Sequence, residues 1–359
     1  MKVLRLAAIA LFSLAPLAVC AQSAPSTGKD VAARAEVGAA VTAVGADSFA
    51  GISVPFAGGV RGYPDVVYET LLGYRPMKLD LFLPPPSFAA KGPRPVIVYI
   101  HGGGWVGGGP RRSAAYSDWP KVLASMAEHG YVVASVSYRF AGEAPFPAAI
   151  QDVKAAIRFL RANSAKYGID SGRFVTIGQS AGGHLASLAA VSCGAPGLSP
   201  PATTIPKAAN VELTASAAKG ADEVSDCVQG AVSWFGVYDF STMPKGKLAG
   251  KSPMDMFLHC PDTGCDADVV KAASPLSYVT AKTPPILVMH GAKDRQVPVD
   301  QAYRFEAALK AAGVKTDLVI YPDTDHSWIN PTPEETGAVS RGALSKSLDF
   351  IEALIGDKK

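Results

Sequence analysis

The hydrophobic pattern of this chain alternates between short apolar runs and longer segments with helical spacing. Runs of five or so almost wholly apolar residues are typical of strands that are buried on both faces. Six segments have this character: residues 96–100, 131–136, 173–177, 231–235, 286–289 and 318–321. Two earlier segments, residues 66–68 and 78–83, also predict strands, the second with the polar and apolar alternation of a half-exposed strand.

Segments with apolar residues three and four positions apart lie between several of these runs. Residues 148–166 have this spacing and are followed by Gly168, a common helix stop. Residues 301–312 end in the same way at Gly313, and residues 341–355 predict a closing helix. Because strands and helices alternate, the pattern predicts an α/β fold with a mostly parallel central sheet and helices on both faces.

The beginning of the chain has the pattern of an export signal. Lys2 and Arg5 precede an apolar run that ends in Val19, Cys20 and Ala21, which favours cleavage after Ala21 and makes residues 1–21 a signal peptide. The run is too short for stable membrane insertion. A lipoprotein anchor at Cys20 is the less favoured alternative, because valine is unusual before a lipidated cysteine. We therefore expect an exported protein, periplasmic or secreted.

Composition and charge add limits to this picture. Residues 22–60 are rich in small residues without a clear period and predict a flexible N-terminal segment, whereas residues 61–359 predict a single α/β domain. Apolar residues make up 48% of the chain and charged residues 18%, which is enough to fill a large core. The net charge of +3 does not favour nucleic acid or an anionic membrane as a partner.

The cysteines predict disulfides rather than a metal site. Four cysteines remain after the signal peptide is removed. An even number of cysteines in an oxidising compartment favours disulfide pairing. Cys260 and Cys265 flank a turn-forming Pro-Asp-Thr-Gly stretch, which favours a local bridge and leaves Cys193 with Cys227, although four cysteines allow three pairings. We expect no metal, because the chain has no Cys-x-x-Cys pair with histidines.

The sharpest chemical signal is the motif Gly178-Gln179-Ser180-Ala181-Gly182. It lies between the strand that ends at residue 177 and a helical stretch, residues 183–192. A sharp turn from strand to helix exposes the serine, and glycines two positions away on each side leave room for the neighbouring backbone. The motif therefore predicts Ser180 as the nucleophile of an acyl-transfer reaction.

A serine nucleophile needs a base, and in folds of this kind the acid and the histidine follow the serine in chain order. Asp294 and His326 each follow a predicted parallel strand, so they lie at the same sheet edge as Ser180. We predict Asp294 as the acid and His326 as the base. Three other aspartates are alternatives for the acid: Asp239, Asp323 and Asp325. Three other histidines are expected to be structural: His129, His184 and His259.

The motif His101-Gly102-Gly103-Gly104-Trp105 directly follows a buried strand and suits an oxyanion hole. Glycines allow backbone N–H groups to approach the substrate oxygen, and we predict Gly103, Gly104 and the N–H of Ala181 as donors. Trp105 and Trp328 lie on the two loops beside the site. They are candidates for substrate binding, with packing in the core as the alternative.

These motifs resemble those of the hormone-sensitive-lipase-like esterases and, more closely, of bacterial esterases that include feruloyl and acetyl xylan esterases. The resemblance spans residue 66 to the C-terminus and also rests on four further segments: Ser137-Tyr138-Arg139, Phe146-Pro147-Ala148, Asp152, and His290-Gly291 through to Val297-Pro298. It implies an α/β-hydrolase fold and a serine carboxylic ester hydrolase without a cofactor. The motifs indicate little about the substrate; we expect short-chain, aromatic or carbohydrate-linked esters, the last two because Trp105 and Trp328 are candidates for the pocket wall.

Two alternatives to this function stay open. The His-Gly-Gly-x-Trp pattern is also similar to that of kynurenine formamidase, which would make the chain an amide or formyl hydrolase. A catalytically silent binding protein could have the same fold. Residues 193–227 and 260–265 depart from the family pattern, and the sequence indicates neither the natural ester nor the oligomeric state.

Overall fold

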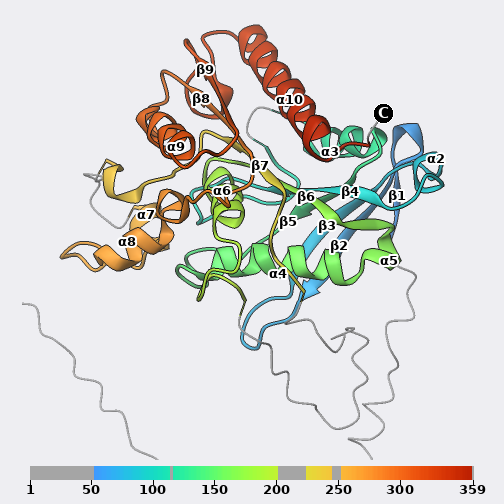
Figure 1. Ribbon diagram of the computed structural model, residues 1–359, viewed down its shortest axis with the longest axis horizontal. Helices are drawn as coiled ribbons and strands as arrows, with labels where there is room; N and C mark the ends of the chain where they lie inside the picture. Colours follow the sequence, from blue (N-terminus) through green and yellow to red (C-terminus); the bar gives the residue numbers. More distant parts are fainter. Residues whose placement is uncertain (1–51, 114–115, 201–223, 245–251, 358–359) are drawn as a thin grey trace, which may run out of the picture. The chain divides into compact units, whose positions relative to one another are not determined.

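The computed structural model describes residues 52–113, 116–200, 224–244 and 252–357. The predicted signal peptide, residues 1–21, and most of the segment 22–60 lie outside these ranges. The described residues contain one nine-stranded sheet with helices on both faces, which confirms the predicted α/β architecture (Figure 1). The strands are β1 Val54–Pro55, β2 Arg61–Glu69, β3 Met77–Leu83, β4 Arg94–Ile100, β5 Val132–Val136, β6 Ile169–Gln179, β7 Gly230–Trp234, β8 Ile286–Gly291 and β9 Thr316–Tyr321.

The strands are arranged in the order β1-β2-β3-β5-β4-β6-β7-β8-β9. The pairs β1–β2, β2–β3 and β3–β5 are antiparallel. All the pairs that follow in this order, from β5–β4 to β8–β9, are parallel. The carboxyl ends of β6, β8 and β9 therefore meet at one edge. β9 differs from the prediction of burial on both faces: its residues are only partly buried, because it is an edge strand with β8 as its one neighbour in the sheet.

Two cores form because successive strand residues point to opposite faces of the sheet. In β4, Val96 and Val98 belong to one cluster, whereas Ile97 and Tyr99 belong to the other. Helices α4, α6 and α9 supply the first cluster, and α3 and α10 supply the second (Figure 1). The α-helices are α2 Pro86–Ala89, α3 Trp119–Glu128, α4 Ala148–Ala162, α5 Ser164–Tyr167, α6 Ala181–Val191, α7 Pro253–Phe257, α8 Ala267–Ala273, α9 Asp300–Ala311 and α10 Pro333–Ile355.

The predicted helices appear with shifted ends. The segment 148–166 forms two helices, because α4 ends at Ala162 and the short α5 follows after Asn163. Gly168, which has a left-handed φ of 64°, caps the end of α5. α10 begins eight residues before the predicted start at 341, since Thr332 and Glu335 form a capping box there. No helix within the described ranges has the length and apolar character needed to cross a bilayer.

The predicted boundary at residue 61 lies inside an ordered hairpin. β1 pairs with β2 in antiparallel register, and a short 3-10 turn, η1 Ala57–Gly59, connects them. Residues 54–59 therefore form a strand of the sheet and the turn that leads into β2. The sequence did not reveal this strand because two residues are too few to establish a period, and their place depends on the partner strand.

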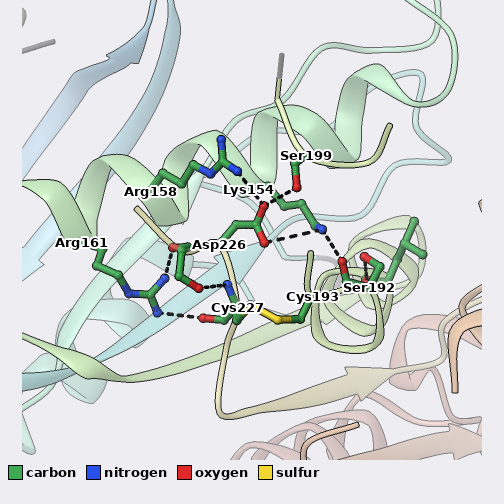
Figure 2. The surroundings of a disulfide bond; sticks show 10 residues. Lys154, Arg158, Arg161, Ser192, Cys193, Ser199, Asp226 and Cys227 are labelled. Atoms are coloured by element: carbon green, nitrogen blue, oxygen red, sulfur yellow. Dashed lines mark hydrogen bonds and ion pairs between the residues drawn. A yellow bond between two sulfur atoms is a disulfide. The ribbon is translucent and has the colours of Figure 1, made fainter. Parts of the chain in front are cut away.

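Both predicted disulfides are present, Cys193 with Cys227 and Cys260 with Cys265. The first closes the segment between α6 and β7, and buried charges lie beside it (Figure 2). Lys154 of α4 donates to the carbonyl oxygen of Ser192 at 2.6 Å and lies 3.7 Å from the carboxylate of Asp226. The bridge and this network together hold both ends of the segment 193–227 against α4, while residues 201–223 lie outside the described ranges.

Candidate active site

The predicted nucleophile lies in a strained turn between β6 and α6. Ser180 has φ 53° and ψ −121°, a backbone conformation that non-glycine residues rarely adopt. Its N–H donates to the carbonyl oxygen of Trp234 at 2.9 Å. Gly182 permits this turn, since a Cβ there would lie 2.0 Å from the carbonyl oxygen of Ile100. The local backbone thus holds the serine hydroxyl at the end of β6, as expected for this motif.

The structure brings Ser180, His326 and Asp294 together. The Nε2 atom of His326 lies 2.9 Å from the Oγ atom of Ser180, and its Nδ1 atom lies 2.7 Å from the Oδ2 atom of Asp294. Asp294 follows β8, and His326 begins the 3-10 turn η5 His326–Trp328 after β9. The three side chains therefore reach one another from the carboxyl ends of three parallel strands.

Four hydrogen-bond donors surround the Asp294 carboxylate. Its Oδ1 atom accepts the backbone N–H groups of Gln296 at 2.9 Å and Val297 at 2.8 Å, and its Oδ2 atom faces His326 and His290. Burial raises the pKa of this carboxyl, but the hydrogen bonds from the two histidines outweigh burial, so the pKa lies well below its ordinary value. An ionised Asp294 keeps the proton of His326 on Nδ1, which leaves Nε2 able to accept from Ser180.

His290 contacts the predicted acid, a role that no motif in the sequence indicates. Its Nε2 atom lies 2.9 Å from the carbonyl oxygen of Val297 and 3.2 Å from the Oδ2 atom of Asp294. Because a carbonyl oxygen can only accept, Nε2 carries the proton and is shared between the two acceptors. A spacing of four residues before Asp294, at the end of a buried strand, was the signal that could have revealed this contact.

The alternatives for the acid are engaged elsewhere. Each of the three aspartates has a partner of its own, in an ion pair or a cap: Asp323 with Lys293 at 2.7 Å, Asp325 with Arg295, and Asp239 with the backbone N–H of Ser241 at 3.0 Å. Asp325 also accepts the backbone N–H of His326 at 2.7 Å and thereby holds the histidine loop rather than the imidazole.

The glycine-rich loop after β4 lies against the nucleophile. Gly103 has φ 124°, and a Cβ at this position would lie 2.3 Å from the carbonyl oxygen of Gly107, so only glycine fits. Gly103 and Gly104 line the same cavity as Ser180, and Ala181 is the first residue of α6. The N–H groups of a helix's first turn have no partner within the helix, which suits the predicted role of Ala181.

A cavity of about 450 Å³ opens above these residues, a size that suits a small-molecule ligand. Residues from the glycine-rich loop, the nucleophile turn and the histidine loop form its wall. The lining residues are Gly102, Gly103, Gly104, Gly108, Gly109, Arg112, Ser113, Gln179, Ser180, Phe235, Pro253, Gln296, His326 and Ser327.

The structure differs from the prediction of substrate contacts for Trp105 and Trp328. Both are buried, with exposed fractions of 5% and 1%, and neither lines the cavity. Trp105 stacks on Phe257 with ring centroids 4.7 Å apart, and Trp328 packs in the core between the sheet and α10. Their positions on the two loops were correct, but sequence alone does not show which way a side chain points. Phe235 is in the cavity wall, with its ring 4.7 Å from that of His326, but it is also buried.

His184 is structural, as expected, and it should make stability depend on pH. Its Nδ1 atom accepts from the Nε1 atom of Trp105 at 3.1 Å, and its Nε2 atom donates to the carbonyl oxygen of Ala273 at 2.8 Å. A proton added to Nδ1 would therefore face a donor and have no acceptor. Burial lowers the pKa of both His184 and His101 to about 4. Since an unfolded histidine titrates near pH 6.5, the unfolded state binds more protons between about pH 4 and 6.5.

We therefore predict that the free energy of unfolding falls as the pH drops from 6.5 towards 4, by up to about 1.4 kcal/mol per pH unit for each histidine. Urea denaturation at several pH values measures the slope. The variant His184→Gln keeps an acceptor and a donor but cannot titrate. Its free energy of unfolding should therefore depend less steeply on pH, by the contribution of one histidine. An unchanged slope in this variant would contradict the assignment.

Comparison with known proteins places these features in a family context. A family model described as BD-FAE matches residues 79–309, a range that includes Ser180 and Asp294. Esterase LipQ of Mycobacterium tuberculosis is 34% identical over 244 residues, covering 68% of this chain and 52% of LipQ. An isoprenylcysteine alpha-carbonyl methylesterase of Arabidopsis thaliana, ICME, is 29% identical over 259 residues, covering 70% of this chain and 53% of its own length. The chain spans about half the length of the curated relatives it matches.

Solved structures support the fold. A truncated carbohydrate esterase from gut microbiota superposes with a TM-score of 0.63 and 26% identity, covering 84% of this chain and 99% of that one. The bifunctional GH43-CE protein of Bacteroides eggerthii gives a TM-score of 0.62 and 31% identity, over 82% of this chain and 35% of that one. Together with the parallel sheet, these similarities show an α/β-hydrolase fold.

Proposed function

The chain belongs to the BD-FAE family, and we propose from this premise that it hydrolyses carboxylic esters through an acyl-enzyme formed on Ser180. The observation that carries the proposal is the hydrogen-bonded series from Ser180 through His326 to Asp294, with distances of 2.9 and 2.7 Å. A serine hydroxyl beside an imidazole that a buried carboxylate orients is suited to nucleophilic acyl transfer. The curated relatives named as esterases support the same chemistry.

The proposed reaction has two half-reactions. In the first, Nε2 of His326 takes the proton of Ser180 while Oγ attacks the carbonyl carbon, and the imidazolium then protonates the departing alcohol. In the second, His326 takes a proton from water, the hydroxide attacks the acyl-enzyme, and the carboxylic acid leaves as the proton returns to Ser180. The N–H groups of Gly103, Gly104 and Ala181 would stabilise the negative oxygen of each tetrahedral intermediate. These steps use only groups of this chain and water.

We propose short-chain, aromatic or carbohydrate-linked esters as substrates. The cavity volume of about 450 Å³ supports an ester of small-molecule size. The similarity to a carbohydrate esterase supports an alcohol portion that is a sugar.

Labelling with a fluorophosphonate tests the proposal. Ser180 Oγ should attack phosphorus and displace fluoride, which leaves a phosphonyl adduct that mass spectrometry places on the peptide containing Ser180. Protein denatured before labelling is the control, because the activated hydroxyl exists only in the folded site. A folded protein that neither takes up the probe at Ser180 nor hydrolyses 4-nitrophenyl acetate would contradict the proposal and favour a catalytically silent binding protein.

Export remains part of the proposal. The signal-peptide pattern lies in residues that the structure does not describe, and the two disulfides support an oxidising compartment. Expression of the full sequence in a bacterium should give a mature protein, outside the cytoplasm, whose N-terminal sequence begins at Gln22. A diacylglyceryl group on Cys20 would show the lipoprotein alternative, and an intact Met1 in the mature protein would contradict both.

A further inference from the structure

We propose that Arg112 determines specificity by binding a carboxylate group on the ester substrate. This inference rests on the proposed esterase function and names a substrate class for the same cavity. Arg112 lines the cavity together with Ser180 and His326, and its side chain is exposed. A guanidinium group can donate two parallel hydrogen bonds to the two oxygens of a carboxylate. A neutral ester group has no negative charge to strengthen such bonds.

The charges around the cavity favour an anion. Among the residues that the structure describes, the cavity wall contains Arg112 but no aspartate or glutamate. Two neighbouring arginines are already neutralised: Arg111 pairs with Asp80 at 2.6 Å and Asp65 at 3.0 Å, and Arg295 pairs with Asp325. Within the described ranges Arg112 makes no ion pair, so it is a lining residue of the cavity whose charge no described carboxylate neutralises.

A buried polar network fixes Arg112 relative to the nucleophile. The hydroxyl of Tyr99 donates to the carbonyl oxygen of Arg112 at 3.2 Å, and Ser113 donates to the Oε1 atom of Gln179 at 3.1 Å. Gln179, which directly precedes Ser180, in turn donates to the hydroxyl of Tyr99 at 3.0 Å. The backbone that carries the guanidinium is thus tied to the nucleophile turn, which holds the base of the Arg112 side chain at the wall of the cavity that contains the reacting serine.

Two matched pairs of substrates distinguish the side of the ester that carries the anion. On the acyl side, mono-4-nitrophenyl glutarate is compared with its neutral methyl ester. On the alcohol side, 4-acetoxybenzoate is compared with methyl 4-acetoxybenzoate. We expect the enzyme to prefer the anionic member of one pair by about fivefold in kcat/KM, the upper end of what an ion pair with an exposed side chain contributes. The preference should lie mainly in KM and decrease with added salt.

Variants assign the preference to the side chain. Arg112→Gln should abolish the preference, measured as the ratio of kcat/KM between the two members of a pair, and Arg112→Lys should keep part of it through the retained charge. Arg304→Gln, which removes an exposed charge of α9 outside the cavity lining, is the matched control and should keep the full preference. The proposal is overturned if Arg112→Gln and the unmodified enzyme discriminate equally between the members of both pairs. Failure of the unmodified enzyme to hydrolyse the neutral esters would instead count against the proposed function itself.

Discussion

Replacing Ser180 with alanine is expected to lower kcat for a short-chain 4-nitrophenyl ester by about 10⁶-fold, the scale of loss when a serine hydrolase loses its nucleophile. The rapid initial release of nitrophenol should vanish as well, because no acyl-enzyme can form. What remains is the effect of the oxyanion donors and of substrate binding, which act without the hydroxyl. Stopped-flow absorbance separates the initial burst from steady-state turnover.

The control for this variant is a serine of β6, the strand before Ser180, that lies outside the cavity. Ser171 is exposed near the beginning of β6, and Ser171→Ala should retain full activity. A thermal melt of Ser180→Ala shows whether the fold is intact. We expect a small change in Tm, because serine and alanine must both adopt the same positive φ at this position. A folded Ser180→Ala protein that keeps more than about a hundredth of the activity would refute the assignment of Ser180.

The parallel sheet and the grouping of the three side chains could be predicted because several local signals agreed. Apolar runs marked the strands, and chain order then placed Ser180, Asp294 and His326 at the carboxyl ends of β6, β8 and β9. In a parallel sheet these ends meet at one edge. Residues far apart in the sequence could therefore be predicted to lie close together, even without knowing how the helices pack. The observed contacts between these side chains agree with that reasoning.

Side-chain direction could not be predicted in the same way. Trp105 follows the glycine-rich loop, but its positive φ of 60° and its stacking on Phe257 turn it into the core. His290 followed the predicted strand 286–289 and lies within β8, and the turn after β8 folds Asp294 back onto it. Both outcomes depend on packing between segments far apart in the sequence. For the same reason the buried ion pair between Arg139 and Asp152, at 2.6 Å, was visible only as two motif residues.

Replacing Asp294 with asparagine is the second change with a large expected effect, a loss of about 10⁴-fold in kcat. The carboxylate accepts from two backbone N–H groups through Oδ1 and from His326 and His290 through Oδ2. An asparagine has one acceptor oxygen, so its NH₂ group must face either the backbone donors or the histidines. The backbone donors cannot move, which favours the second orientation. The NH₂ group then faces Nδ1 of His326, and the imidazole proton shifts to Nε2, where it can no longer accept from Ser180.

The matched control for this change is Asp323→Asn, which alters an exposed aspartate of the histidine loop that pairs with Lys293. Its kcat should stay within about twofold of the unmodified enzyme, because a surface ion pair contributes little. Because the pKa of Asp294 lies below its ordinary value, the carboxylate stays ionised from pH 5 to 8, and Asp294→Asn should be impaired across this whole range. Steady-state kinetics of both variants from pH 5 to 8 tests this. If Asp323→Asn lost as much activity as Asp294→Asn, the carboxylate that orients His326 in solution would have to be the one at position 323.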